Sequence, residues 1–107
     1  MRIPADAIIA DDKLTRYLLV QRTFDDKSGF LAQAGFTIYN WALLRQAIRT
    51  LADSAEALGD GGNEYGDLFE VRGPLIGPAG VLGVKLIWMC RAVDGRYYFV
   101  TLVPWKE

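Results

Sequence analysis

The chain has 107 residues, 51% of them apolar, and a formal net charge of −1 at pH 7. This length and composition predict one folded domain spanning residues 1–107 and exclude a chain that is disordered throughout. The small net charge provides no global basic field that would attract nucleic acid.

The side-chain inventory excludes several kinds of catalytic site. The sequence contains no histidine and a single cysteine, Cys90. Histidine-dependent triads and dyads, zinc sites of histidine or thiolate, and an internal disulfide are therefore excluded. We expect no metal and no cofactor, and any catalysis would depend on lysine, arginine, tyrosine, threonine or carboxylates.

The sequence shows no targeting or membrane segment. Its first residues lack the charged start and apolar core of a signal peptide, and no apolar run approaches the roughly 20 residues of a membrane span. We therefore expect a cytoplasmic protein that makes no membrane contact.

The N-terminal third predicts an extended arm followed by two short helices. The arm covers residues 3–10, and the helices cover about 13–20 and 27–34, where apolar residues recur at helical spacing. Gly35 stands where a helix often ends in a left-handed residue. A pair of carboxylates precedes each helix and predicts its cap: Asp11 and Asp12 before the first, Asp25 and Asp26 before the second.

A third helix shows the most regular pattern. Thr37 or Asn40 can begin it and Gly59 can end it, and residues 60–63 then predict a flexible loop. Its apolar stripe, spaced by three and four residues, comprises Trp41, Leu44, Ile48, Leu51, Ala55 and Leu58.

The C-terminal half predicts three antiparallel strands. The first covers about residues 64–72. Residues 73–80 contain two Gly-Pro steps, which predict a connector that cannot join a strand ladder. The second and third strands, 81–93 and 96–103, are separated by Asp94-Gly95, a strong signal for a two-residue hairpin turn.

A two-residue turn would set the register of this hairpin. Trp88 would then face Thr101, and Arg91 would face Tyr98. The inner face would hold Leu82, Val84, Leu86, Trp88, Cys90, Tyr97, Phe99, Thr101 and Val103. The second face would hold Lys85, Ile87, Met89, Arg91, Tyr98, Val100 and Leu102.

These elements predict an α+β fold. Three N-terminal helices would pack on one face of a three- to four-stranded antiparallel sheet that ends in a C-terminal meander, and the N-terminal arm could supply the fourth strand. The second sheet face is apolar in its middle and basic at its ends, which is unusual for a face exposed to water. We expect a partner chain, a second copy or a ligand to cover it.

Two groups of residues are candidates for chemistry. Lys85, Arg91 and Tyr98 lie on the second face with Arg72 on a neighbouring strand, and cations with a phenol can hold a phosphate and move protons without histidine. The alternative is a solvated edge with a tyrosine–arginine stacking pair.

The second group is Asp26, Lys27 and Ser28 with Lys13. A lysine in the first turn of a helix opposes the helix dipole, so Lys27 can have another role, or it can be an exposed lysine paired with Asp25 or Asp26. Thr101 can direct a hydroxyl into a pocket or be an ordinary strand threonine.

The order of these motifs resembles a bacterial family catalogued without a function, whose members occur alone and as C-terminal domains of polymorphic toxins. The resemblance extends over nearly the whole chain. It is carried by Lys13-Leu14, Tyr17-Leu18-Leu19, Asp26-Lys27-Ser28, Phe30, Gly35-Phe36, Tyr65-Gly66, Gly73-Pro74-Leu75, Gly77-Pro78, Gly80, Trp88, Val100-Thr101 and Pro104.

The layout also resembles, more distantly, the ribonuclease fold of barnase, colicin D and RelE-type toxins. That resemblance implies catalysis by Lys27, Lys85, Arg91 and Tyr98, with Arg72, Glu70 and Thr101 binding the substrate. Glu70 would be an alternative to Tyr98 as acid or base. The slightly acidic chain departs from the basic character of such toxins, which makes RNA a less favoured partner.

Two functions are therefore predicted. The first is a protein-interaction or toxin-system-related module that covers its second sheet face with a partner or with its own copy. The alternative is a metal-independent ribonuclease of the RelE or barnase kind. The net charge favours the first.

Overall fold

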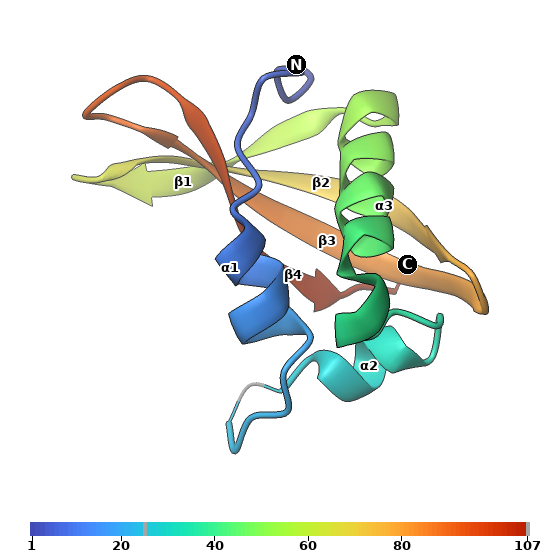
Figure 1. Cartoon of the computed structure of the whole chain (residues 1–107). Coiled ribbons are helices and arrows are strands. Elements are labelled where there is room, and N and C mark those ends of the chain that lie inside the picture. Colours follow the sequence, from blue (N-terminus) through green and yellow to red (C-terminus); the bar gives the residue numbers. More distant parts are fainter. Residues whose placement is uncertain (25, 107) are drawn as a thin grey trace.

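The computed structural model describes residues 1–24 and 26–106 and has an α+β architecture (Figure 1). Asp25, one of the predicted helix caps, lies outside the described residues. The elements are α1 (Asp11–Lys13), the π-helix η1 (Leu14–Leu18), α2 (Ser28–Ala32), the 3₁₀-helix η2 (Ile38–Asn40), α3 (Trp41–Ser54), β1 (Ala57–Asn63), β2 (Gly66–Gly77), β3 (Gly80–Arg91) and β4 (Tyr97–Pro104). None of the helices among these residues is long and apolar enough to cross a membrane.

The four strands form one antiparallel sheet in the order β1-β2-β3-β4. The strand that the sequence did not predict is β1. Its residues were expected to form the end of the third helix and the loop at residues 60–63. The prediction that the N-terminal arm supplies this strand is wrong, because Ile8 makes only an isolated bridge to Tyr98. The glycines of β1 give no alternating pattern, so this strand depends on its pairing with β2.

The β2–β3 hairpin replaces the predicted connector at residues 73–80. β2 continues through Pro74 to Gly77, and Pro74 pairs with Gly83 of β3. β1 pairs only with residues 66–71 of β2, so Pro74 lies where β2 has a neighbour on one side. A proline is tolerated there because no second ladder needs its missing N–H group.

The β3–β4 hairpin is confirmed at Asp94-Gly95, and Gly95 has the positive φ of +68° that its turn requires. The two-residue turn is wrong, because β3 ends at Arg91 and β4 begins only at Tyr97. The longer turn changes the register: Trp88 pairs with Phe99 instead of Thr101.

A β-bulge changes the register of β4 again. The pairing shifts between Ile87 and Trp88, so that Leu86 faces Leu102. The predicted inner positions of Trp88 and Phe99 are confirmed, since both are buried, but beyond the bulge Leu102 is buried in place of Thr101 and Val103. One extra residue in a strand reverses the alternation of every side chain that follows.

The first predicted helix, 13–20, is instead a short α-helix that continues into a π-helical turn. The predicted caps Asp11 and Asp12 are wrong, because both lie inside α1 and no side chain caps it. Their carboxylates form ion pairs, Asp11 with Arg45 of α3 and Asp12 with Arg16.

The second predicted helix is confirmed in a shorter form, as α2. Asp26 Oδ1 accepts a hydrogen bond from the backbone N–H of Ser28, the first residue of α2, across 2.9 Å. Gly35 follows the helix with a φ of +89°. Asp26 and Gly35 were therefore informative about where this helix begins and ends.

The third predicted helix is confirmed as α3, and Leu44, Ile48 and Leu51 are buried on its inner side. It ends at Ser54 instead of Gly59, and Leu58 lies on β1, where it is 51% exposed. The core forms between α3 and the sheet. In Figure 1, α3 crosses the sheet in front of β2 and β3. A Cβ on Gly73 of β2 would lie 2.6 Å from Leu51 Cδ1, so this glycine permits the close approach of α3.

Candidate functional site

The predicted site residues lie in three separate places. Glu70, Arg72 and Lys85 meet in the middle of the sheet. Arg91 and Tyr98 meet at the β3–β4 hairpin. Lys27 and Thr101 meet beside Tyr17, at β4.

We call the sheet surface turned away from α3 the open face. Gly73 lies under Leu51 of α3, so the even-numbered side chains of β2 project from the opposite surface, together with the residues that pair with them. The open face comprises Leu58 of β1; Leu68, Glu70, Arg72, Pro74 and Ile76 of β2; Val81, Lys85, Ile87, Met89 and Arg91 of β3; and Tyr98, Thr101 and Val103 of β4.

A buried carboxylate lies on this otherwise exposed surface. Glu70 is only 5% exposed and accepts a hydrogen bond from Arg72 Nη2, while Lys85 Nζ lies 3.2 Å from its other oxygen. Burial is the largest influence on its pKa and raises it, but the hydrogen bonds and charges of Lys85 and Arg72 together lower the pKa below its ordinary value of 4.5. Glu70 is therefore ionised at neutral pH and is an anchor for two cations.

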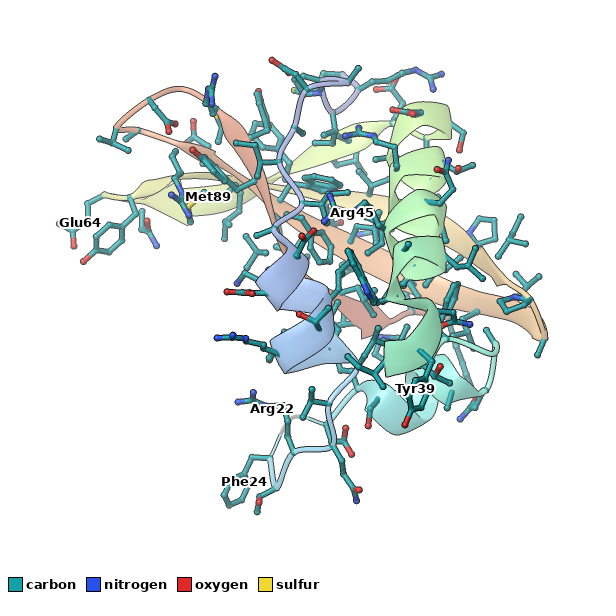
Figure 2. All side chains as sticks on the ribbon, viewed as in Figure 1. Arg22, Phe24, Tyr39, Arg45, Glu64 and Met89 are labelled. Carbon is teal, nitrogen blue, oxygen red and sulfur yellow. The ribbon has the colours of Figure 1, made fainter. Side chains whose placement is uncertain are left out.

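The rest of the open face is largely apolar. Leu68, Ile87 and Met89 are half-buried, and Ile76 and Val81 are 63% and 62% exposed. Shallow hollows of about 430 Å³ lie near its two ends. One is lined by Gly73, Pro74, Val81, Gly83, Trp105 and Lys106, and the other by Glu64, Tyr65, Met89, Arg91, Ala92 and Val93. Figure 2 shows Met89 and Glu64 toward the same end of the sheet.

At the β3–β4 hairpin, the Arg91 guanidinium stacks 3.8 Å from the centroid of the Tyr98 ring. The Tyr98 hydroxyl donates a hydrogen bond to Asp94 Oδ2 across 2.6 Å. This bond is the largest cause of a raised pKa for Tyr98 and of a lowered pKa for Asp94. The stacking pair expected as the alternative for these residues is therefore present, and the phenol is a weaker acid than an ordinary tyrosine.

Lys27 is placed differently from the exposed lysine of the alternative prediction, since it is only 7% exposed. Its Nζ donates to the Tyr17 hydroxyl across 3.1 Å, and Thr101 Oγ1 lies 3.5 Å from the same oxygen. Lys13, grouped with Lys27 from sequence, lies 5.9 Å from the Tyr17 ring centroid, and Arg22 lies 4.9 Å from it. Figure 2 shows Arg22 on the loop between η1 and α2, close to the exposed Phe24.

Tyr17 and Arg22 were missed as site residues. Tyr17 fits the apolar stripe of an ordinary helix, so its spacing predicted packing in the core and not hydrogen bonding by its hydroxyl group. The π-helical turn, closed by the hydrogen bond from Leu19 N–H to the Leu14 carbonyl, places its hydroxyl toward β4. Such turns are rare and often occur at functional sites, but the sequence contains no signal for one here.

Lys85 and Arg91 lie six positions apart on β3, which separates them by about 20 Å along an extended strand. They therefore cannot hold one phosphate together. Among residues 1–24 and 26–106, no three or more acidic or cysteine side chains gather in a way that could hold a metal ion.

A family model described as "Domain of unknown function (DUF6883)" matches residues 4–106. No curated protein matches the chain, and no solved structure matches it. The match supports the predicted resemblance to a family without an assigned function. The toxin context and the ribonuclease-like fold stay predictions.

Proposed function

The chain belongs to the family described as "Domain of unknown function (DUF6883)", and from its geometry we propose that it is a protein-interaction module whose open face docks a protein partner. The observation that carries this proposal is the apolar character of the open face: Ile76 and Val81 are exposed at the β2–β3 turn, and Ile87 and Met89 are half-buried toward the other end of β3. A surface that exposes many apolar side chains is typical of interaction sites.

The charges of the open face indicate the chemistry of the partner. Its strands present three cations, Arg72, Lys85 and Arg91, and one carboxylate, Glu70, whereas the whole chain has a net charge of −1. A partner segment that combines apolar side chains with carboxylates facing Arg72, Lys85 and Arg91 would complement this surface. A second copy would bring two positive faces together, which disfavours the homodimer.

The resemblance to domains of polymorphic toxins supports a place in a toxin system. The ribonuclease alternative is less favoured by geometry. Its residues lie in three places, Glu70 holds two cations, and the Tyr98 hydroxyl already donates to Asp94.

Selection from a displayed random-peptide library tests the proposal. We expect the selected peptides to combine carboxylates with apolar side chains and to shift the NMR signals of the open face. Ile76→Asp and Arg91→Glu should each weaken binding about tenfold, since one good contact contributes about 1.4 kcal/mol. Tyr39→Asp is the control, because Tyr39 is 95% exposed on η2, among the helices.

Peptides that bind the helices instead, or a failure to select any, would contradict the proposal. A dimer in sedimentation velocity that Ile76→Asp dissociates would identify a second copy as the partner. Cleavage of RNA by the wild type that is lost in Lys27→Met would favour the ribonuclease alternative.

A further inference from the structure

We propose that the free edge of β2 docks an extended, uncharged segment of a partner protein, which binds there as an additional strand. β1 pairs with β2 only at residues 66–71, so no strand among the described residues lies beside residues 72–77 on that side. At the rise of an extended strand, this free edge is about 20 Å long and matches a segment of about six residues. The site does not depend on the proposed interaction of the open face.

The backbone of this edge directs hydrogen-bonding groups outward. Pro74 pairs with Gly83 of β3, and the Gly83 carbonyl accepts a hydrogen bond from the Trp105 N–H across 3.0 Å, on the opposite side of β3. The residues of an antiparallel pair either exchange their hydrogen bonds or direct these groups away from each other. The Pro74 carbonyl therefore points toward the free edge. Ile76, two residues further along β2, has the same orientation and presents both an N–H and a carbonyl there.

A hollow of about 270 Å³ accompanies this edge. The side chains of Pro74 and Ile76 belong to the open face, whereas α3 covers the opposite face of the sheet. A hollow that both sets of residues line must lie beside the edge of β2, where the two faces meet. Its walls include Leu43, Ala47 and Thr50 on the helical side and Pro74, Ile76 and Pro78 on the strand side.

Charge complementarity identifies the kind of occupant. None of the described side chains that line the hollow is charged, although 23% of the residues in the chain are. The site therefore offers only partial charges, on the backbone groups of the edge and on polar side chains such as Gln46 and Thr50. An extended peptide presents N–H and carbonyl groups at the spacing that such an edge requires, and its alternate side chains can enter an adjacent hollow. The segment is thus uncharged, in contrast to the acidic segment proposed for the open face.

A second copy of the chain fits this site less well than a foreign segment. Two paired β2 edges would each contribute Pro74, which has no N–H, so some carbonyls of the new ladder would lack a donor. Each copy would also bring its own α3, which flanks the same edge. A foreign segment has neither restriction.

Protection against aggregation is the competing explanation for this edge, since a proline on an edge strand blocks uncontrolled pairing. It accounts for Pro74. It does not account for Ile76, which keeps its N–H at the same edge and is 63% exposed, or for the hollow beside it. An edge that is only protected should bind no peptide, so a binding measurement separates the two explanations.

Titration with a capped peptide of about six alternating threonine and valine residues, followed by two-dimensional NMR of the whole chain, tests the site. These residues favour a strand and carry no charge. We expect saturable shifts at Ile76 and Thr50, and slower exchange of the Ile76 N–H with solvent. The same peptide with methylated backbone nitrogens should bind at least about fivefold more weakly, because it cannot donate to the Pro74 carbonyl.

Ile76→Pro removes the N–H that faces the edge and should weaken peptide binding at least about fivefold relative to Ile76→Ala. Ile76→Ala is the matched control, because it shortens the side chain and keeps the N–H. The ladder to β3 does not use this N–H, and β2 already contains Pro74 in the same orientation, so the fold should tolerate the substitution.

Thr50→Trp tests the hollow by filling it from an exposed position on α3, and it should also weaken binding. Ala42→Trp is its control, since Ala42 is exposed on the same helix and does not line the hollow. Arg91→Glu, which alters the open face, should leave the affinity for this uncharged peptide unchanged. The two docking proposals can therefore fail separately.

Four results would overturn the proposal: no saturable shifts, equal binding of the methylated peptide, equal binding by Ile76→Pro and Ile76→Ala, or shifts confined to β1 and β4. A dimer in sedimentation velocity that Ile76→Pro dissociates would also overturn it, because a second copy would then occupy the edge. Thermal unfolding of each variant shows whether the fold is kept, and the methylated peptide tests the same hydrogen bonds on the unaltered protein.

Discussion

On the open face, Lys85 of β3 lies diagonally across from Glu70 of β2, with 3.2 Å between Nζ and Oε2. Arg72 donates to the other carboxylate oxygen, so both oxygens of a buried carboxylate are held by cations. This arrangement satisfies Glu70 within the sheet and leaves two cations near the surface where a partner would dock. It also makes the stability of the sheet dependent on pH.

Glu70→Gln should lower the free energy of unfolding by about 1–3 kcal/mol at neutral pH, because it weakens hydrogen bonds to charged donors. The folded-state pKa of Glu70 is below the ordinary value of 4.5, so its contribution is complete above that value and is lost as the pH falls through the folded pKa. The advantage of the wild type should therefore shrink in acid. Urea unfolding over a pH series measures it, with the exposed Asp60→Asn as the control, and an advantage that persists unchanged in acid would refute the assignment.

Gly35→Ala should destabilise the protein more than Gly95→Ala. Both glycines have positive φ, +89° and +68°, so both substitutions carry a backbone strain of about 1–2 kcal/mol. Only at Gly35 would the new Cβ meet other atoms, at 2.9 Å from Pro78 Cγ and 3.0 Å from Ala79 Cβ. The difference between the two midpoints of chemical unfolding reports the contact of the segment after α2 with the β2–β3 turn, and equal losses would disprove that contact.

Leu102→Ala should cost about 2–5 kcal/mol, the usual loss for a fully buried leucine, because Leu102 packs in the core opposite Leu86. Val103→Ala should cost less than half as much, since Val103 lies on the open face and is only half-buried. Equilibrium unfolding of the two variants compares them directly. A larger loss of stability at Val103 would instead support the register expected from a two-residue turn without a bulge.

Tyr98→Phe should raise the pKa of Asp94 toward its ordinary value of 3.8, because the hydrogen bond from Tyr98 is the main cause of its lowered pKa. Conversely, Asp94→Asn should bring the raised pKa of Tyr98 down toward 10.0. NMR titration of the carboxyl and ring signals measures both. Tyr97 is an internal control, since burial is the main cause of its raised pKa, and a parallel shift of Tyr97 would indicate a general change in the hairpin.

Candidate sites were predictable only where their residues share one strand pair or a short segment. Arg91 and Tyr98 were placed together correctly because a hairpin brings them close under either register. The π-helical turn that directs Tyr17 toward Thr101 depends on packing between segments more than eighty residues apart, which no local pattern encodes. The geometry of a strand already predicts that Lys85 and Arg91 lie far apart. The two were nevertheless grouped in one site because of the resemblance to nucleases.

The sequence by itself determined the parts of the fold that depend on short-range spacing. It predicted the buried stripe of α3, the turn at Gly95, and the sorting of Trp88 and Phe99 inward and Arg91 outward, because periodicity and turn chemistry act within a few residues. Only the tertiary structure decided that β1 is a strand, that β2 continues through Pro74, and that a bulge turns Leu102 inward. These outcomes depend on which strand lies beside which, and that pairing is settled by contacts between distant residues.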